Sequence, residues 1–62
     1  MKNNIKQLRE RFDLTQEDLA REIDISRQTI ISLEKEHFSP SIILAFKLTK
    51  LFNCQIENIF IY

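Results

Sequence analysis

Apolar residues recur along the chain at the three- and four-residue spacing of helices that bury one face. Ile5, Leu8 and Phe12 form such a stripe between charged and polar neighbours, which predicts a first helix. The same spacing predicts four more helices, at about residues 16–23, 27–35, 41–52 and 55–60. Their expected inward-facing residues are Leu19, Ala20, Ile23, Ile30, Leu33, Ile42, Ala45, Leu48, Leu51, Phe52, Ile56, Ile59 and Phe60. The pattern therefore predicts an all-α fold of five short helices around one core.

Capping residues stand at several of the predicted helix ends. Thr15 lies three residues before Asp18 in a shortened form of the capping box, so the second helix should begin directly after Thr15. Ser26 is a suitable N-cap for the third helix, and Pro40 is suited to the entry of the fourth helix. Asn53 follows the fourth helix, where a residue in the left-handed conformation is expected. The sequence has no glycine and a single proline. Because β-sandwiches and barrels depend on tight turns, this composition favours helices.

Length and composition are those of a small intracellular domain, spanning residues 1–62. One cysteine and one histidine exclude a disulfide framework and a His/Cys zinc site, and they favour a reducing, cytoplasmic setting. The apolar runs are far shorter than the ~20 residues that span a bilayer. Nine basic and nine acidic residues cancel. This balance excludes a uniformly basic nucleic-acid coat, but it is compatible with a locally basic face.

The most informative stretch is residues 16–35, where a helix, a short break and a second helix follow one another. So short a connection makes the two helices cross steeply and presents the start of the second one outward. Such a helix fits the major groove of DNA, where each base pair shows its own pattern of donors and acceptors. Its first turn contains Arg27, Gln28 and Thr29. Arginine can bind guanine, glutamine can bind adenine, and threonine offers a hydroxyl and a methyl group, so this turn is typical of a base reader.

Residues 5–60 resemble a Cro/C1-type helix-turn-helix domain, the Xre-like and lambda-repressor-like fold of minimal single-domain regulators. The matching segments are residues 5–9, 14–20, 25–30, 33–34 and 40–42. The joint spacing of a few residues makes the match specific: Gln16, Ala20, Ile25, Ile30, Glu34 and Pro40. The resemblance implies a transcriptional regulator that binds double-stranded DNA by sequence.

The resemblance also implies roles for individual residues. Base-edge contacts would come from Arg27, Gln28, Thr29 and Ser32. Contacts with the DNA backbone would come from Gln16, Ser26, Lys35, His37 and Ser39. Lys6 is added because it lies in a basic N-terminal segment, for which the alternative is an ordinary solvated helix face. Gln16 would offer a phosphate its side chain or its backbone N–H. Arg9 and Glu34 match a pair that joins the first helix to the third and orients the reading helix.

Two positions depart from the family pattern, which usually has glycine in the turn and again after the third helix. This chain has Asp24 and Glu36 there, at positions that often need a positive φ. Aspartate tolerates that conformation. For Glu36, either the residue adopts it at a cost of roughly 1 kcal/mol, or the loop takes another course.

Other polar residues favour ordinary structural roles over chemistry. Glu17, Asp18 and Glu22 share one helix, but no nucleophile is paired with them, and the first two suit the positive end of the helix dipole. His37 has no second metal ligand at usable spacing. Cys54 stands where the family has a buried aliphatic residue, which favours a small core residue over a reactive thiol. We therefore expect that this protein is not an enzyme and that it binds no metal or cofactor, and nothing in the sequence implies a small-molecule ligand.

Apolar residues exceed what one side of the fourth helix can bury, since residues 42–46 are all apolar and residues 59–62 end the chain equally apolar. We expect a homodimer interface formed by Ile43, Phe46, Ile56, Phe60, Ile61 and Tyr62. Two copies would hold their reading helices about 34 Å apart, matching a palindromic operator. The expected function is a repressor. The alternative is a protein-interaction module on the same scaffold, such as an antitoxin-like or anti-repressor partner.

Overall fold

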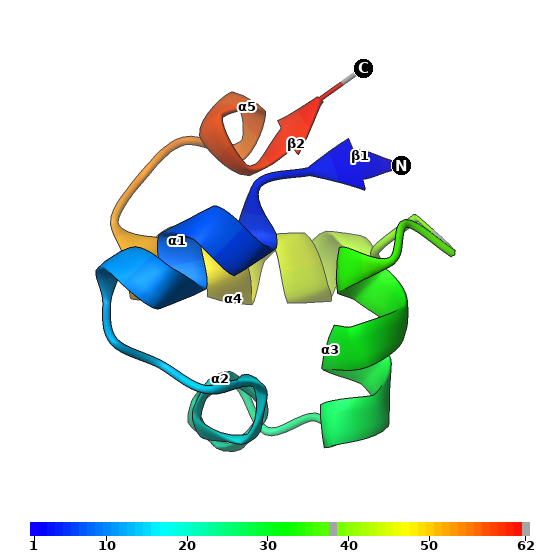
Figure 1. Ribbon diagram of the computed structural model, residues 1–62. Coiled ribbons are helices and arrows are strands. Elements are labelled where there is room, and N and C mark those ends of the chain that lie inside the picture. The colour runs from blue at the N-terminus through cyan, green and yellow to red at the C-terminus, as the bar shows by residue number, and fades with distance from the viewer. Residues whose placement is uncertain (38, 62) are drawn as a thin grey trace.

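The computed structural model describes residues 1–37 and 39–61, so Phe38 and Tyr62, the latter an expected interface residue, lie outside the described residues. Within these ranges the chain forms five helices and two short strands. Their bounds are β1 Lys2–Asn3, α1 Ile5–Arg11, α2 Gln16–Glu22, α3 Arg27–Glu34, α4 Ile42–Phe52, α5 Ile56–Ile59 and β2 Phe60–Ile61. The predicted helical fold is confirmed. Figure 1 shows α1, α4 and α5 stacked above α2, with α3 at one side.

The core lies between the helices, and the apolar faces of the helices pack together in it. Its buried residues are Ile5, Leu8, Leu19, Ala20, Ile23, Ile30, Leu33, Leu44, Ala45, Leu48, Phe52, Ile59 and Phe60. The prediction that Ile42 faces inward is wrong, because its side chain is 85% exposed. Ser41 caps α4 by accepting a hydrogen bond from the Leu44 N–H, so Ile42 is the first helical residue. The buried stripe of α4 begins at Leu44, and Ile42 lies beside it.

Two other predicted core positions are about half exposed. Phe12 ends α1 with 47% of its surface exposed, and its ring meets the edge of Phe52 at a centroid distance of 5.4 Å. Ile56, at the start of α5, is 49% exposed. Both residues lie at helix ends.

Four helices in the described part of the chain end in the same left-handed turn, although the sequence has no glycine. The left-handed residues are Asp13, Asp24, Glu36 and Asn53, with φ angles of 56°, 57°, 64° and 50°. In each turn the next residue's N–H donates to the carbonyl five residues earlier, with N···O distances of 2.9 to 3.2 Å. This is the bond of the Schellman motif, which usually relies on glycine. Asn53 and Asp24 behave as predicted, Glu36 adopts the costly conformation, and Asp13 was not foreseen.

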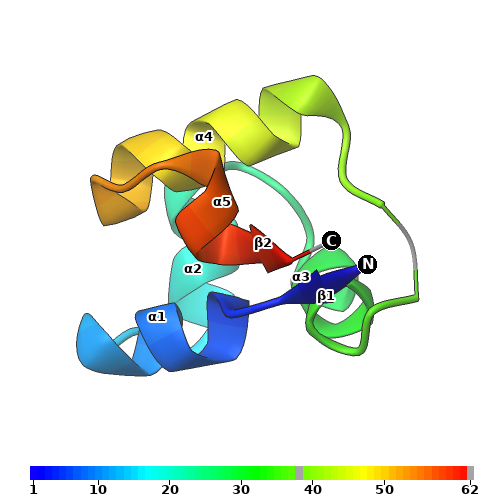
Figure 2. The same cartoon turned by 90° about the horizontal axis from the view of Figure 1, so that it is seen from above.

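A pair of two-residue strands, absent from the sequence prediction, joins the two ends of the described chain. β1 and β2 are antiparallel, with Lys2 opposite Ile61 and Asn3 opposite Phe60. Figure 2 shows the two strands side by side next to α5. Because the last helix ends at Ile59 and not at residue 60, Phe60 enters the strand and is only 7% exposed. Within residues 1–37 and 39–61, no helix has the length and apolarity needed to cross a membrane.

Candidate nucleic-acid interface

The α2 and α3 helices form a steeply crossed pair. Figure 1 shows α2 end-on and α3 from the side. Thr15 Oγ1 accepts a hydrogen bond from the Asp18 N–H, and the Asp18 carboxylate accepts one from the Thr15 N–H, both at 3.0 Å. Ser26 Oγ accepts from the Thr29 N–H at 3.1 Å. The predicted starts of both helices are therefore confirmed, and each start is fixed by its own local cap.

One side of α3 is buried and the other faces outward. Ile30 and Leu33 are fully buried. Arg27 and Gln28 are exposed in the first turn, whereas Thr29 and Ser32 are half-buried. We call the outward residues of this helix the reading face: Arg27, Gln28, Thr29 and Ser32. Within it, Thr29 Oγ1 lies 2.8 Å from Ser26 Oγ, so the two hydroxyls share a hydrogen bond.

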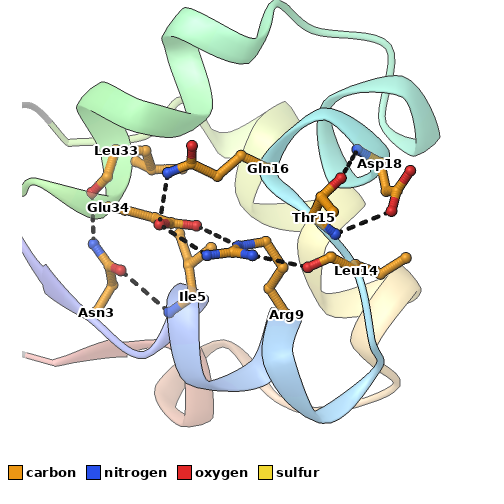
Figure 3. Close-up of polar contacts among 9 residues, drawn as sticks. All are labelled: Asn3, Ile5, Arg9, Leu14, Thr15, Gln16, Asp18, Leu33 and Glu34. Atoms are coloured by element: carbon orange, nitrogen blue, oxygen red, sulfur yellow. Dashed lines mark hydrogen bonds and ion pairs between the residues drawn. The ribbon is translucent and has the colours of Figure 1, made fainter.

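A nearly buried ion pair fixes the far end of α3. Arg9 Nε donates to Glu34 Oε2 at 2.8 Å, and the two side chains are only 11% and 8% exposed. Arg9 Nη1 also donates to the Leu14 carbonyl at 2.8 Å, and Gln16 Nε2 donates to Glu34 Oε1 at 3.2 Å. Figure 3 shows Arg9 of α1 and Gln16 of α2 both contacting Glu34. The pair that the resemblance implies is thus present, within a network that holds α3 against both helices.

Gln16 therefore lies at the start of α2 with its side-chain amide turned toward Glu34. Beside it is a surface hollow lined by Arg9, Thr15, Gln16, Glu17 and Arg27. The hollow places one expected base-contacting residue, Arg27, next to one expected phosphate-contacting residue, Gln16. The first N–H groups of α2 lack partners within the helix, as at any helix start, and such groups are suited to phosphate oxygens.

The other residues expected at the DNA backbone are spread over three segments. Lys6 is exposed on α1, and Ser26 caps α3. Lys35 ends α3, and His37 and Ser39 are exposed in the loop that follows. The structure thus brings Gln16 and Arg27 together, whereas Lys6 stands apart from the hollow.

Sequence reasoning missed two side chains that brace the helix pair. Asn3 Nδ2 donates to the Leu33 carbonyl at 2.8 Å, although 30 residues separate them. Lys47 Nζ donates to the Ile23 carbonyl at 3.1 Å and so satisfies the end of α2. A local pattern could not reveal either contact, because each partner is a backbone carbonyl from a distant segment.

Two titratable groups among the described residues, Asp18 and Cys54, have shifted pKa values. The Thr15 backbone N–H stabilises the ionised carboxylate of Asp18 and lowers its pKa below the usual value, and the Thr15 hydroxyl makes a smaller contribution in the same direction. Burial raises the pKa of the Cys54 thiol, which packs against the core as a half-buried residue. Within residues 1–37 and 39–61, no three His, Cys, Asp or Glu side chains are grouped to hold a metal ion.

A second surface lies on α4 and α5. Ile43 and Phe46 on α4 are 67% and 61% exposed, and they accompany the exposed Ile42. A groove between the two helices is lined in part by Ile42, Phe46 and Ile56. We call Ile42, Ile43, Phe46 and Ile56 the apolar face.

The remaining expected interface residues are placed differently. Phe60 is only 7% exposed and belongs to the core, as its inward-facing prediction has it, so it offers little surface to the expected interface. Ile61 is 45% exposed in β2 but does not line the groove. Ile42, which was expected in the core, joins the apolar face instead.

Comparison with known proteins agrees with this geometry. The helix-turn-helix family model matches residues 5–59. An uncharacterized HTH-type transcriptional regulator of Methanocaldococcus jannaschii is 55% identical over 62 residues, covering 100% of this chain and 94% of that protein. One from Archaeoglobus fulgidus is 45% identical, covering 100% and 87%. The regulator YgzD of Bacillus subtilis is 42% identical over 60 residues, covering 97% and 91%.

Proposed function

The chain belongs to the helix-turn-helix family of DNA-binding transcriptional regulators, and from this membership we propose that it binds a palindromic operator as a homodimer and acts as a repressor. The protein is thus a DNA-binding regulator and not an enzyme. As a binder of operator DNA, it would act in the cytoplasm. The single observation that carries the proposal is the exposed first turn of α3 on a helix whose two ends are both fixed.

The reading face supplies the base contacts in this proposal. Arg27 and Gln28 are exposed at the start of α3, the end of such a helix that enters the major groove. Arginine recognises guanine and glutamine recognises adenine through paired hydrogen bonds. Ser32 follows one turn later on the same side as Gln28. Thr29 offers its methyl group, since its hydroxyl already bonds to Ser26.

Contacts with phosphates set the register of the reading face on the duplex. The residues proposed for them are Lys6, Gln16, Ser26, Lys35, His37 and Ser39. Gln16 has two routes to a phosphate. Its backbone N–H lies at the start of α2, and its amide is held beside Arg27 in the same hollow. Because the sequence has no net charge, we expect non-specific attraction to DNA to be weak and base contacts to decide affinity.

The apolar face supports dimerisation. Ile42, Ile43 and Phe46 expose 85%, 67% and 61% of their surface on one helix, more than isolated apolar residues on a soluble protein need. A two-fold axis through this face would pair α4 and α5 with their copies. Two reading faces would then meet successive major grooves about 34 Å apart. Occupying such a site in a promoter is enough to block RNA polymerase, so repression needs only these two surfaces.

Selection from a random duplex library tests the proposal. The purified protein is incubated with the library at roughly physiological salt, where non-specific phosphate binding is weak. We expect enrichment of an inverted repeat whose half-sites are centred about 10 base pairs apart. Enrichment of one half-site without a repeat would reject the homodimer. If folded protein enriches no sequence, operator binding is rejected, and the protein-partner alternative would be tested by pull-down.

A further inference from the structure

Asn3 connects α1 and α3 through its side-chain amide, and its backbone pairs with β2. Its Nδ2 donates to the Leu33 carbonyl in the last turn of α3 at 2.8 Å, and its Oδ1 accepts from the Ile5 N–H at the start of α1 at 3.2 Å. Its backbone belongs to β1, where it is paired with Phe60 of β2. Figure 3 shows Asn3 reaching the end of α3 from the strand, while Gln16 and Arg9 reach Glu34 from α2 and α1. The end of α3 is therefore held from two sides.

The Leu33 carbonyl accepts a second hydrogen bond, in the turn that follows α3. It accepts the Glu36 N–H at 3.0 Å, one of the two hydrogen bonds that define the left-handed turn. Glu36 has a φ of 64°, a conformation that is costly for a residue with a Cβ atom. Asn3 Nδ2 donates to the same oxygen. Its side chain thus fixes the carbonyl on which a strained turn depends.

This turn determines where the next loop lies relative to the helices. Lys35 stands at the end of α3, and His37 and Ser39 follow the left-handed residue. If the turn loosens, the loop loses its direction, whereas the first turn of α3 is still held by Ser26 and by packing against α2. Loss of Asn3 should therefore affect the loop residues and leave Arg27 and Gln28 in place.

We propose that Asn3 is a positioning residue for DNA binding, which braces the turn after α3 and so directs Lys35, His37 and Ser39 to the phosphates. The inference rests on the proposed function, in which these three residues meet the DNA backbone. Asn3 itself contacts no DNA in this scheme. It acts through the Leu33 carbonyl.

The neighbouring asparagine provides a matched control. Asn4 Nδ2 donates to the Asn58 carbonyl in α5 at 3.2 Å, a bond that involves no part of α3. Asn3→Asp retains an oxygen for the Ile5 N–H but turns a carboxylate toward the Leu33 carbonyl. Asn4→Asp adds the same charge one residue away. Because both variants add one negative charge at nearly the same place, their general repulsion of DNA is similar and cancels in the comparison.

The measurement is the dependence of DNA affinity on salt concentration, using the duplex enriched by selection and a scrambled duplex. Each phosphate that a lysine or arginine neutralises contributes about 0.9 to the slope of log K against log salt, and Lys35 is the residue of this kind in the loop segment. We expect Asn3→Asp to have a slope smaller by up to about 1 than Asn4→Asp, and to bind both duplexes about tenfold more weakly. Base discrimination should be equal in the two variants. Adding Glu36→Gly to Asn3→Asp should restore much of the slope, because glycine holds the turn without the brace.

Three results would overturn the inference: equal slopes for the two variants, a loss of base discrimination in Asn3→Asp alone, or no rescue by Glu36→Gly. Circular dichroism checks folding first. If Asn3→Asp does not fold, the comparison is made between Asn3→Ala and Asn4→Ala, which add no charge. Failure of the proposed function looks different, because the unmodified protein would then show no preference for the enriched duplex.

Discussion

The reading face and the apolar face are held in different ways. The reading face lies on α3. The first turn of this helix donates a hydrogen bond to Ser26, and its last turn accepts hydrogen bonds from Asn3 and Arg9. The apolar face stands on α4 and α5, where Ile42, Ile43, Phe46 and Ile56 expose between 49% and 85% of their surface. The first surface is polar, and hydrogen bonds at both ends of its helix fix its orientation. The second surface consists of exposed apolar side chains beside a groove.

The difference follows from the interactions each surface is proposed to make. Hydrogen bonds to base edges depend on angle and distance, so a base-reading helix must keep its orientation before DNA arrives. Burial of apolar area is non-directional and roughly proportional to area. An association surface therefore needs exposed area and a complementary shape more than a braced set of donors and acceptors. The predictions below test whether the two surfaces can be damaged independently.

The largest effect is expected at Glu34. Replacing Glu34 with Ala leaves the Arg9 guanidinium, only 11% exposed, without its carboxylate. Removing one partner of a buried pair typically costs about 3–5 kcal/mol of unfolding free energy. Urea denaturation at neutral pH measures the loss. Arg21→Ala is the control, because its pair with Asp18 is exposed and is expected to contribute at most about 1 kcal/mol. Equal stabilities of the two variants would mean that the network does not hold α3.

The next effect is expected on the apolar face. Phe46→Glu places a charge where the side chain is 61% exposed, so the fold of one chain should be retained. In a homodimer the same charge would be buried, and the dissociation constant should rise about 100-fold or more, equivalent to about 2.7 kcal/mol. Sedimentation over a range of concentrations measures it. Gln7→Glu, on the exposed side of α1, is the control. A Phe46→Glu protein that dimerises as tightly as this control would exclude the apolar face as the interface.

A smaller effect is expected when the reading face itself is changed. Arg27→Ala and Gln28→Ala should each weaken specific binding by about 1–3 kcal/mol and relax the preference at one base pair. Unfolding free energy should change little, since both side chains are exposed. Lys6→Ala, at a proposed phosphate contact, should instead weaken binding to all sequences about equally. Competition between the enriched duplex and its point variants separates these outcomes, and unchanged base preference in both α3 variants would refute the assignment.

Local signals made most of the fold predictable from the sequence. The caps at Thr15 and Ser26 and the left-handed residues Asp24 and Asn53 depend on neighbours within a few positions, and all four behave as predicted. The contacts of Asn3 and Lys47 join segments more than 20 residues apart, so no local pattern reveals them. Ile42 was misplaced because helical spacing alone does not say where a buried stripe begins. The strand at Phe60 and Ile61 was missed because this spacing does not say where a helix gives way to a strand.

The smallest effect is expected at the turn after α3. Glu36→Gly should raise the unfolding free energy by about 1 kcal/mol, because glycine adopts the φ of 64° without the penalty of a Cβ atom. Asn53→Gly is the matched control, and its gain should be smaller since asparagine already tolerates this conformation. Thermal and urea unfolding measure both. The added stability should change neither dimerisation nor base preference, because Glu36 belongs to neither the apolar face nor the reading face. A destabilised Glu36→Gly protein would mean that the glutamate side chain contributes more than its backbone conformation costs.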